Sequence, residues 1–446
     1  MNYKTPGVYV EEIAKFPPSV AQVETAIPAF IGYTAQGPKN EPTRISSMLE
    51  YETLFGKAKN EAFTFTINPA TTVAPIKPRT VTATVAPSPF KMYYAMQMYF
   101  ANGGGPCYIV SVGNAVGYPT ALDGVKLSEL KAGLDTLEKE DEPTLIVFPD
   151  AEALNNDAYE LYGLALNQAE LMKDRFVIMD VVGNTSTAVK EFRDNLDSGE
   201  NLKYGAAYYP KLETVLSYSY DQAITVGTDT LEHWRTHDSE LYNLAKNAIE
   251  SNRVVMTPSS AMAGVYAKVD ANSGVFKAPA NIGLSFVVAP KLKISHEDQE
   301  SLNVDATAGK SINAIRTFTG RGIQVWGART LDGNSNEWRY ISVRRFFNMV
   351  EESVKKATER FVFEPNTANT WIRVQTMIEN FLNQQWQDGA LAGSKPEEAY
   401  YVSVGLNKTM SAQDILEGRM IVEIGMAAVR PAEFIVLRFS HKLQES

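Results

Sequence analysis

The stretch LIVFPDAEALNNDAYELYGLALNQAELMKDRFVIMD, residues 145–180, carries the pattern that decides the fold. It opens on the apolar run Leu145–Phe148 and closes on the apolar run Phe176–Asp180, and Tyr159–Met172 between them has the spacing of a helix. Strands that are apolar on both faces and are joined through helices are typical of a parallel sheet with helices packed on it. The stretch therefore predicts one strand–helix–strand unit of a central α/β domain.

The same alternation continues on both sides of this stretch. Helices are expected over Ser47–Phe55, Met92–Ala101, Ala188–Leu196 and Leu231–Ile249, and further buried strands over Ala29–Tyr33, Tyr108–Val112, Gly205–Tyr209 and Val254–Met256.

Two regions depart from the alternation. Residues Lys57–Pro89 are rich in Pro, Thr and Ala and predict an extended surface insertion with edge strands, which we interpret as decoration. Later, an Asp332-Gly333 turn separates two expected strands, Gly322–Leu331 and Glu337–Val343, and two amphipathic helices and two closing strands follow. The sequence thus predicts an α+β part after the α/β part.

The two late helices each have an apolar stripe. In the first, the Glu351–Lys355 and Glu352–Lys356 pairs are expected on the solvent side. The second is expected over Thr370–Trp386. The predicted stripes are Phe347, Val350, Val354, Ala357 and Phe361 in the first helix, and Trp371, Val374, Ile378 and Phe381 in the second.

Composition excludes several classes of function. The chain has 446 residues and a net charge of −10, so it lacks the basic face that nucleic-acid binding requires. No run approaches eighteen apolar residues and the first residues lack the core of a signal peptide, so we expect synthesis in a cytoplasm and no membrane insertion. The single cysteine, Cys107, has an apolar setting that predicts a buried strand position rather than a reactive thiol.

Motifs for nucleotide and metal binding are incomplete. Gly309-Lys310-Ser311 resembles the end of a phosphate-binding loop, but the glycine required five positions earlier is Val304. His233 and His237 have a metal-ligand spacing with no third ligand, and Asp332, Asn334 and Asn336 begin a calcium-loop pattern that fails at Glu337 and Val343. We expect no cofactor and no metal.

Ser259-Ser260 after a strand is the one hint of a hydrolase, because it resembles the serine region of subtilisin-like proteases. A serine nucleophile needs a histidine base held by an acid, and no histidine stands in a suitable context upstream. The sequence does not support an enzyme.

Several longer stretches closely resemble the contractile tail sheath proteins of phages, phage-tail-like bacteriocins, extracellular injection particles and type VI secretion machines. They occur in the family's order along the whole chain, and only Lys57–Pro89 has no counterpart. The matching stretches are Thr5–Glu12, Asn102–Val110, Pro258–Asp270, Gly274–Asn281, Phe318–Leu331, Trp338–Arg345 and Arg430–Val436.

This resemblance implies a structural, non-enzymatic subunit that stacks with copies of itself as helical rings around an inner tube and contracts to drive the tube through a target envelope. Baseplate and terminator proteins are the other implied partners. The implied location is the producing bacterium's cytoplasm, followed by a tail or tail-like particle that can be released. A degenerate subtilisin-like hydrolase and a baseplate or terminator protein with a sheath-like fold remain as alternatives.

The implied fold is a central subtilisin-like α/β domain with a parallel sheet, a carboxy-terminal α+β domain and extended terminal arms. The expected bounds are 1–22 for the amino-terminal arm and tether, 23–112 for an amino-terminal part with the 57–89 insertion, 113–321 for the central domain, 322–430 for the carboxy-terminal domain and 431–446 for the carboxy-terminal arm.

In the family the arms add strands to sheets of neighbouring subunits, and the residues here fit that role. Val8, Tyr9 and Val10 form a short alternating strand, Pro17 and Pro18 predict an extended tether, and Ile435, Leu437 and Phe439 give the closing strand an apolar face. Pairing of both termini within one subunit is the alternative. The resemblance also makes the loop at Glu397-Glu398 a candidate for contact with the inner tube.

Overall fold

The computed structural model describes residues 19–71, 77–114, 124–185, 187–196 and 199–437. These residues form two compact units. The first contains residues 24–349 and the described end of the chain, 430–437, and the second contains residues 350–429 together with 19–23. The boundary falls inside the helix α10 (Ile341–Thr358). The five-part division expected from the sequence stays a prediction.

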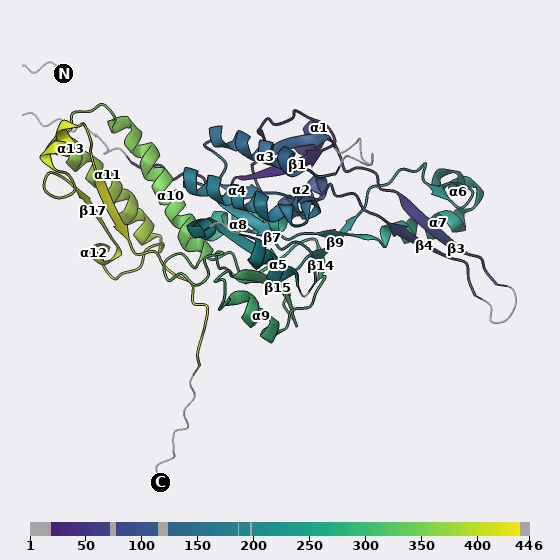
Figure 1. Ribbon diagram of the computed structural model, residues 1–446. Coiled ribbons are helices and arrows are strands. Elements are labelled where there is room, and N and C mark those ends of the chain that lie inside the picture. Colours follow the sequence, from purple (N-terminus) through teal and green to yellow (C-terminus); the bar gives the residue numbers. More distant parts are fainter. Residues whose placement is uncertain (1–18, 72–76, 115–123, 186, 197–198, 438–446) are drawn as a thin grey trace, which may run out of the picture. The chain divides into compact units, whose positions relative to one another are not determined.

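The first unit is built around a nine-stranded sheet of order β13-β16-β15-β8-β7-β6-β1-β5-β2 (Figure 1). The six strands from β15 to β5 run parallel to one another. The edge strands β13 and β2, and β16 next to β13, run antiparallel to their neighbours. In sheet order the strands are β13 (Ile282–Gly283), β16 (Gly322–Trp326), β15 (Ile312–Phe318), β8 (Gly205–Tyr209), β7 (Phe176–Asp180), β6 (Leu145–Val147), β1 (Pro28–Thr34), β5 (Cys107–Asn114) and β2 (Thr43–Ile45).

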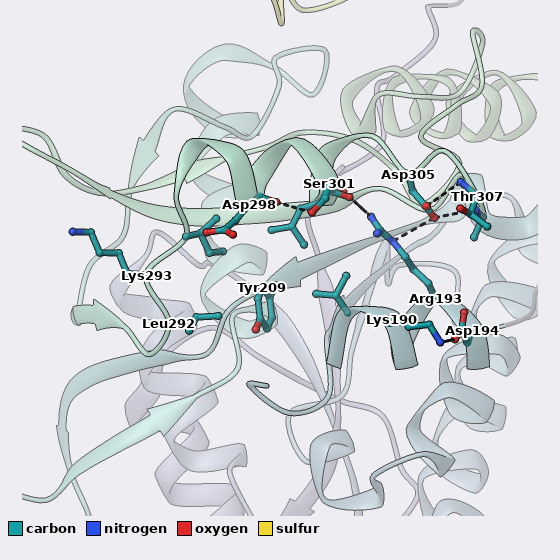
Figure 2. A pocket seen from close by; sticks show the side chains of 14 residues that line it. Lys190, Arg193, Asp194, Tyr209, Leu292, Lys293, Asp298, Ser301, Asp305 and Thr307 are labelled. Atoms are coloured by element: carbon teal, nitrogen blue, oxygen red, sulfur yellow. Dashed lines mark hydrogen bonds and ion pairs between the residues drawn. The ribbon is translucent and has the colours of Figure 1, made fainter. Parts of the chain in front are cut away.

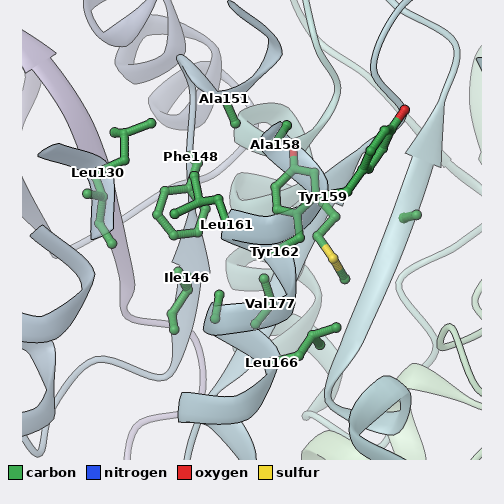
Figure 3. Packing of buried hydrophobic residues seen from close by; sticks show 14 of the residues in the cluster. Leu130, Ile146, Phe148, Ala151, Ala158, Tyr159, Leu161, Tyr162, Leu166 and Val177 are labelled. Carbon is green, nitrogen blue, oxygen red and sulfur yellow. The ribbon is translucent and has the colours of Figure 1, made fainter. Parts of the chain in front are cut away.

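Helices cover both faces of this sheet. Along β7, Val177 and Met179 pack into one apolar layer, and Phe176 and Ile178 pack into the other. The first layer, part of which Figure 3 shows, includes side chains of α3 (Leu127–Thr136), α4 (Asp157–Met172), α5 (Ala188–Asn195) and α9 (His296–Asn303). The second includes side chains of α1 (Met48–Phe55), α2 (Met92–Ala101) and α8 (Ser259–Ser273). The predicted α/β architecture is confirmed.

One predicted strand belongs elsewhere. Val254–Met256 is part of β12 (Arg253–Met256), which pairs antiparallel with β9 (Leu212–Ser217) in a three-stranded sheet completed by β14 (Val287–Pro290). The expectation that it continues the parallel sheet is wrong, because β9, which follows β8 closely in the chain, supplies a different partner.

The long helix expected over Leu231–Ile249 is two helices, α6 (Leu231–His237) and α7 (Ser239–Glu250). Asp238 interrupts them with an extended backbone, and its carboxylate accepts a hydrogen bond from the Leu241 N–H at 2.9 Å. A short acidic side chain can satisfy a free N–H group at the first turn of a helix, which favours a new start over continuation.

The Lys57–Pro89 segment is more than surface decoration. It forms a hairpin of β3 (Phe63–Asn68) and β4 (Thr80–Val85), which lies beside α7 in Figure 1. Phe63 is buried in an apolar cluster with Leu241 of α7, and Arg79 forms a 2.6 Å ion pair with Asp238. Leu241 lies 178 residues further along the chain than Phe63, so the local composition could not reveal this contact.

The predicted strand pair around Asp332-Gly333 is also wrong. β16 pairs with β15 in the main sheet, and beyond it only one bridge, Arg329 with Tyr340, joins the two sides of the turn. The expected strand Glu337–Val343 instead leads into α10, which begins at Ile341.

The second unit contains the end of α10, α11 (Ala368–Gln387) and a two-stranded antiparallel sheet of β17 (Tyr400–Val404) and β18 (Val422–Met426). In α11 the predicted stripe is buried at Val374, Ile378 and Phe381, while Trp371 is half-buried. The short helices α12 (Pro396–Ala399) and α13 (Ala412–Leu416) complete the second unit. In the first unit, the two-residue strands β10 (Thr225–Val226) and β11 (Asp229–Thr230) form a separate antiparallel pair.

The apolar stripe predicted for α10 is displaced. Phe347 and Val354 are only half-buried, whereas Phe346 and Ser353 are buried. Glu352, expected on the solvent side, is also buried and forms ion pairs with Lys355 and Lys356 at 3.2 and 3.4 Å. Val350 and Phe361 of the predicted stripe are buried as expected, so the displacement is partial.

Candidate assembly interface

The end of the described chain is an exposed apolar segment, Phe434–Leu437, with exposed fractions of 71, 79, 76 and 72%. Ile435 and Leu437, two of the predicted arm residues, lie in it. Residues 430–437 form no helix or strand within the described part of the chain. Exposed apolar segments are typical of surfaces that interact with a partner, which makes this segment a candidate interface.

Glu433, directly before this segment, is held by the first unit. Its carboxylate accepts hydrogen bonds from Arg329 at 2.9 and 2.7 Å, from Asn303 at 2.7 Å and from Tyr340 at 3.1 Å. Burial acts to raise the pKa of Glu433, but these hydrogen bonds and the charge of Arg329 outweigh it and lower the pKa. The segment therefore leaves the subunit from a fixed point.

At the other end of the chain, the predicted arm residues Val8, Tyr9 and Val10 and the tether residues Pro17 and Pro18 lie outside the described residues, as does Phe439. The described part of the expected tether, residues 19–23, lies in the second unit. Val20 is buried there, and the Val23 N–H donates to the Ser353 hydroxyl at 3.1 Å.

The β17–β18 sheet is open on both sides. Its register runs from Tyr400 opposite Met426 to Val404 opposite Val422, and no third strand pairs with it in the described residues. An uncovered strand edge presents N–H and C=O groups that can pair with another chain. This sheet can therefore accept an added strand.

The predicted tube-contact residues Glu397 and Glu398 lie on α12, and both are exposed. Glu398 accepts a hydrogen bond from the Ser394 N–H at 2.8 Å, which fixes the preceding loop. Glu397 is thus the better probe of a surface role, because changing it removes no hydrogen bond of this loop.

Ser259 has no catalytic setting. It is buried at the start of α8, where its hydroxyl and N–H donate to the Asp180 carboxylate at 2.5 and 2.8 Å. Burial raises the pKa of Asp180 to about 7, against the lowering effect of hydrogen bonds from Ser259 and Thr257. Among the described residues no histidine is a hydrogen-bond partner of Ser259, so the serine–histidine contact of a catalytic triad is not found there.

The loop that ends in Gly309-Lys310-Ser311 binds its own carboxylate. Asp305 accepts hydrogen bonds from the N–H groups of Thr307 and Ala308, both at 3.1 Å, and pairs with Arg193 at 3.4 Å. The Lys310 ammonium donates to the carbonyls of Arg193 and Leu196 at the end of α5. The groups that would hold a phosphate are therefore occupied by protein partners.

Figure 2 shows a cavity of about 490 Å³ beside this loop, between α5 and α9. Arg193 enters it but also donates to the carbonyls of Ser301, Leu302 and Lys310 at 2.9, 3.1 and 3.0 Å. These hydrogen bonds of Arg193 fix α5 against the loop.

The metal-like patterns have structural roles. The imidazoles of His233 and His237 stack with centroids 3.9 Å apart on the exposed side of α6. Asn334 donates to the Asp305 carbonyl at 3.0 Å. Among the described residues no group of three or more His, Cys, Asp or Glu side chains could hold a metal, and no helix is long and apolar enough to cross a membrane. Cys107 is buried, and burial raises the pKa of its thiol.

Sequence reasoning missed the residues that hold the chain ends. Glu433 lies in the matching stretch Arg430–Val436, and Arg329 and Arg345 lie in the stretches Phe318–Leu331 and Trp338–Arg345, but no local pattern pairs them. The one available signal in the sequence was Glu433 itself, an isolated acidic residue directly before the apolar run Phe434–Leu437.

Residues 334–442 match the model of the phage tail sheath C-terminal domain. The whole chain is similar to the PVC sheath complex of an extracellular contractile injection system in its contracted state, with 31% identity, coverage of 100% of this chain and 99% of that one, and a TM-score of 0.68.

The contracted helical sheath of the anti-feeding prophage is 34% identical over 99% of this chain and 100% of that one, with a TM-score of 0.65. A chain of the contracted baseplate of the same prophage is 28% identical over 100% of both chains, with a TM-score of 0.73. Among curated proteins none matches. With identity above 30% over its full length, the chain belongs to the contractile tail sheath family.

Proposed function

We propose that the protein is the sheath subunit of an extracellular, phage-tail-like injection particle. In this role it polymerises as stacked helical rings around an inner tube, meets a baseplate at one end, and contracts to push the tube forward. The observation that carries the proposal is similarity along the entire chain, at 31 and 34% identity, to subunits of two such sheaths. The protein is then made in the producing cell and leaves it as part of the particle.

The terminal arms link neighbouring subunits in this proposal. Phe434–Leu437 supplies a strand whose Ile435 and Leu437 face an apolar surface of the next subunit, and residues 8–10 supply a second strand. The open β17–β18 sheet is the acceptor, because backbone pairing gives affinity while the alternating side chains fix the register. Pairing within one subunit is not favoured for Phe434–Leu437, since these side chains are exposed there.

Contact with the inner tube is assigned to the exposed acidic turn at Glu397 and Glu398, and a terminator caps the sheath. The subunit performs no catalysis, because the buried Ser259–Asp180 pair has neither a base nor access for a substrate. Contraction then draws its free energy from assembly: the extended sheath is metastable and the contracted one is lower in free energy.

Co-expression of the chain with its inner-tube and baseplate proteins tests the proposal. The expected result is long sheathed tubes in negative-stain micrographs that shorten irreversibly when triggered with mild acid or urea. A protein that forms only short rings at tube ends would be a terminator or baseplate component, and a protein that labels with a serine-reactive phosphonate would be a hydrolase; either outcome would overturn the proposal.

A further inference from the structure

The chain is fixed by side-chain hydrogen bonds at two points where it leaves the first unit, at Glu433 and at Thr25. At each point one partner is an arginine from the stretch that runs from the end of β16 to the first turns of α10. We propose that Arg329 anchors the carboxy-terminal arm, and Arg345 the segment that enters β1, to the nine-stranded sheet, so that tension between neighbouring subunits passes into the sheet. This inference rests on the proposed donor role of the arms and deepens it, because it names the residues on the donor's own side that resist the pull.

The carboxy-terminal anchor joins Arg329 to Glu433, 104 residues apart. The Arg329 side chain is only 4% exposed, and its Nε and Nη2 each donate to a different oxygen of Glu433. This two-point geometry resists rotation as well as separation, which a single hydrogen bond does not. The next residue, Phe434, is already exposed, so among the described residues the anchor lies directly before the exposed end segment.

Arg329 is in turn fixed to the sheet. Asn313, in β15, accepts a hydrogen bond from the Arg329 N–H and donates one to its carbonyl, both at 2.8 Å. The Arg329 Nη1 donates to the carbonyls of Asn303 and Gly333 at 3.3 and 3.2 Å. A pull on Glu433 is therefore transmitted to a strand that is paired on both sides, with β8 and β16.

The amino-terminal anchor is built from a different set of groups. The Thr25 hydroxyl donates to Asp270 of α8 at 2.6 Å, and the Thr25 carbonyl accepts from Arg345 at 2.9 Å and from Thr144 at 2.8 Å. Arg345 also pairs with Asp270 at 2.5 Å and lies over the Tyr266 ring at 4.6 Å. Three residues after Thr25 the chain enters β1, which pairs with β5 on one side and β6 on the other.

One segment of the chain connects the two anchors. Between Arg329 and Arg345 the segment closes on itself, since the Thr330 N–H donates to the Arg339 carbonyl and the Ile341 N–H to the Ala328 carbonyl, at 2.8 and 3.0 Å. It is also tied to β8 by the Leu331 N–H, which donates to the Gly205 carbonyl at 2.9 Å. The anchors thus share one support on the sheet.

A buried ion pair elsewhere in the same unit gives a matched comparison. Arg175 and Asp174 are adjacent in sequence, 2.8 Å apart and almost fully buried, and Arg175 donates to the carbonyls of Leu137 and Glu140. None of these residues belongs to a terminal segment. If buried arginine pairs served stability alone, disrupting this pair and disrupting the anchor would have the same consequences for the particle.

The test is Glu433→Gln in the complete particle, with Asp174→Asn as the matched control. Glutamine keeps the shape of the side chain but removes the charge. We expect amide hydrogen exchange of residues 430–437 in the free subunit to rise by about tenfold, while the subunit still unfolds cooperatively. Extended sheaths form, but on triggering they break, so that the mean length of continuous contracted sheath falls severalfold. Asp174→Asn lowers the melting temperature and leaves both readouts at the parent's values.

Tyr340→Phe is the milder second variant, since it removes one hydrogen bond from Glu433 without leaving a charge unpaired, and it should shift both readouts less and in the same direction. Unbroken contracted sheaths of parental length in Glu433→Gln would overturn the anchor, and so would unchanged hydrogen exchange at residues 430–437. Deletion of residues 434–446 distinguishes the donor role of the arm from the anchor at Glu433. If the deletion abolishes assembly while Glu433→Gln sheaths contract normally, the donor role is supported and the anchor is refuted. If the deletion variant assembles, both are refuted.

Discussion

The apolar face of the carboxy-terminal arm gives the sharpest prediction. Ile435→Asn combined with Leu437→Asn polarises the face that we assign to the neighbouring subunit. The matched control, Phe434→Asn combined with Val436→Asn, makes the same number of changes on the opposite face of the strand. All four side chains are more than 70% exposed in the free subunit, so neither pair of changes should lower its melting temperature by more than a degree or two.

The magnitude follows from the exposed fractions. Complete burial of an Ile or Leu side chain contributes about 1.5–3 kcal/mol, and with 79 and 72% exposure in the free subunit about three quarters of that remains to be gained, roughly 1–2 kcal/mol each. The backbone ordering cost is the same in both variants and cancels. Losing both side chains should therefore weaken each junction by about 2–4 kcal/mol, or roughly 30- to 700-fold in its association constant.

The assay is the critical concentration for sheath assembly, measured by pelleting over a dilution series and checked by negative-stain microscopy. The Ile435/Leu437 variant should assemble only at far higher concentration, if at all, while the Phe434/Val436 control stays within a few-fold of the parent. Equal effects of the two variants would refute the strand register, and no effect of either would refute the arm as a donor.

Three further predictions concern other parts of the chain. Deletion of residues 1–12 should leave a subunit with a cooperative thermal transition but abolish sheath assembly; loss of that transition in the isolated subunit would place the strand in its own fold. Glu397→Lys, compared with Glu160→Lys at an exposed position of α4, should reduce the fraction of tubes that carry sheath in co-expression micrographs, and equal occupancy in both variants would remove the acidic turn from the tube contact. Burial raises the pKa of Asp180 to about 7, so the folded protein binds this proton more tightly than the unfolded chain does. The free energy of unfolding therefore falls as pH rises from about 4 towards 7. Asp180→Asn should lack this fall, so the melting temperature of the variant minus that of the parent should be higher at pH 8 than at pH 5. A parallel pH dependence in parent and variant would contradict that assignment.

Where a segment is buried on both faces, the sequence alone predicted the structure. Phe176–Asp180 and Gly205–Tyr209 occur as strands with the expected bounds, because a run that is apolar on both sides can only be stable inside a covered parallel sheet. The family resemblance supplied the role of the ends, since Arg430–Val436 and the stretches around Arg329 and Arg345 occur together in the expected order. The sequence offered incomplete motifs around Ser259, Lys310 and His233, and the structure gives each of these side chains a local packing or hydrogen-bonding partner.

Contacts between distant segments decided the rest. Three features depend on residues that are far apart in the chain. They are the pairing of β12 with β9, the burial of Phe63 against α7, and the helix break at Asp238, which pairs with Arg79. The clearest case is the pairing of Glu433 with Arg329 and of Thr25 with Arg345. A single charged or hydroxyl side chain beside a terminal segment belongs to no periodic pattern, so the sequence does not predict which residue it pairs with. Propensity and apolar spacing act over a few residues and fix the elements, whereas the free energy that selects among partners comes from burial and charge pairing, which exist only once the chain has folded.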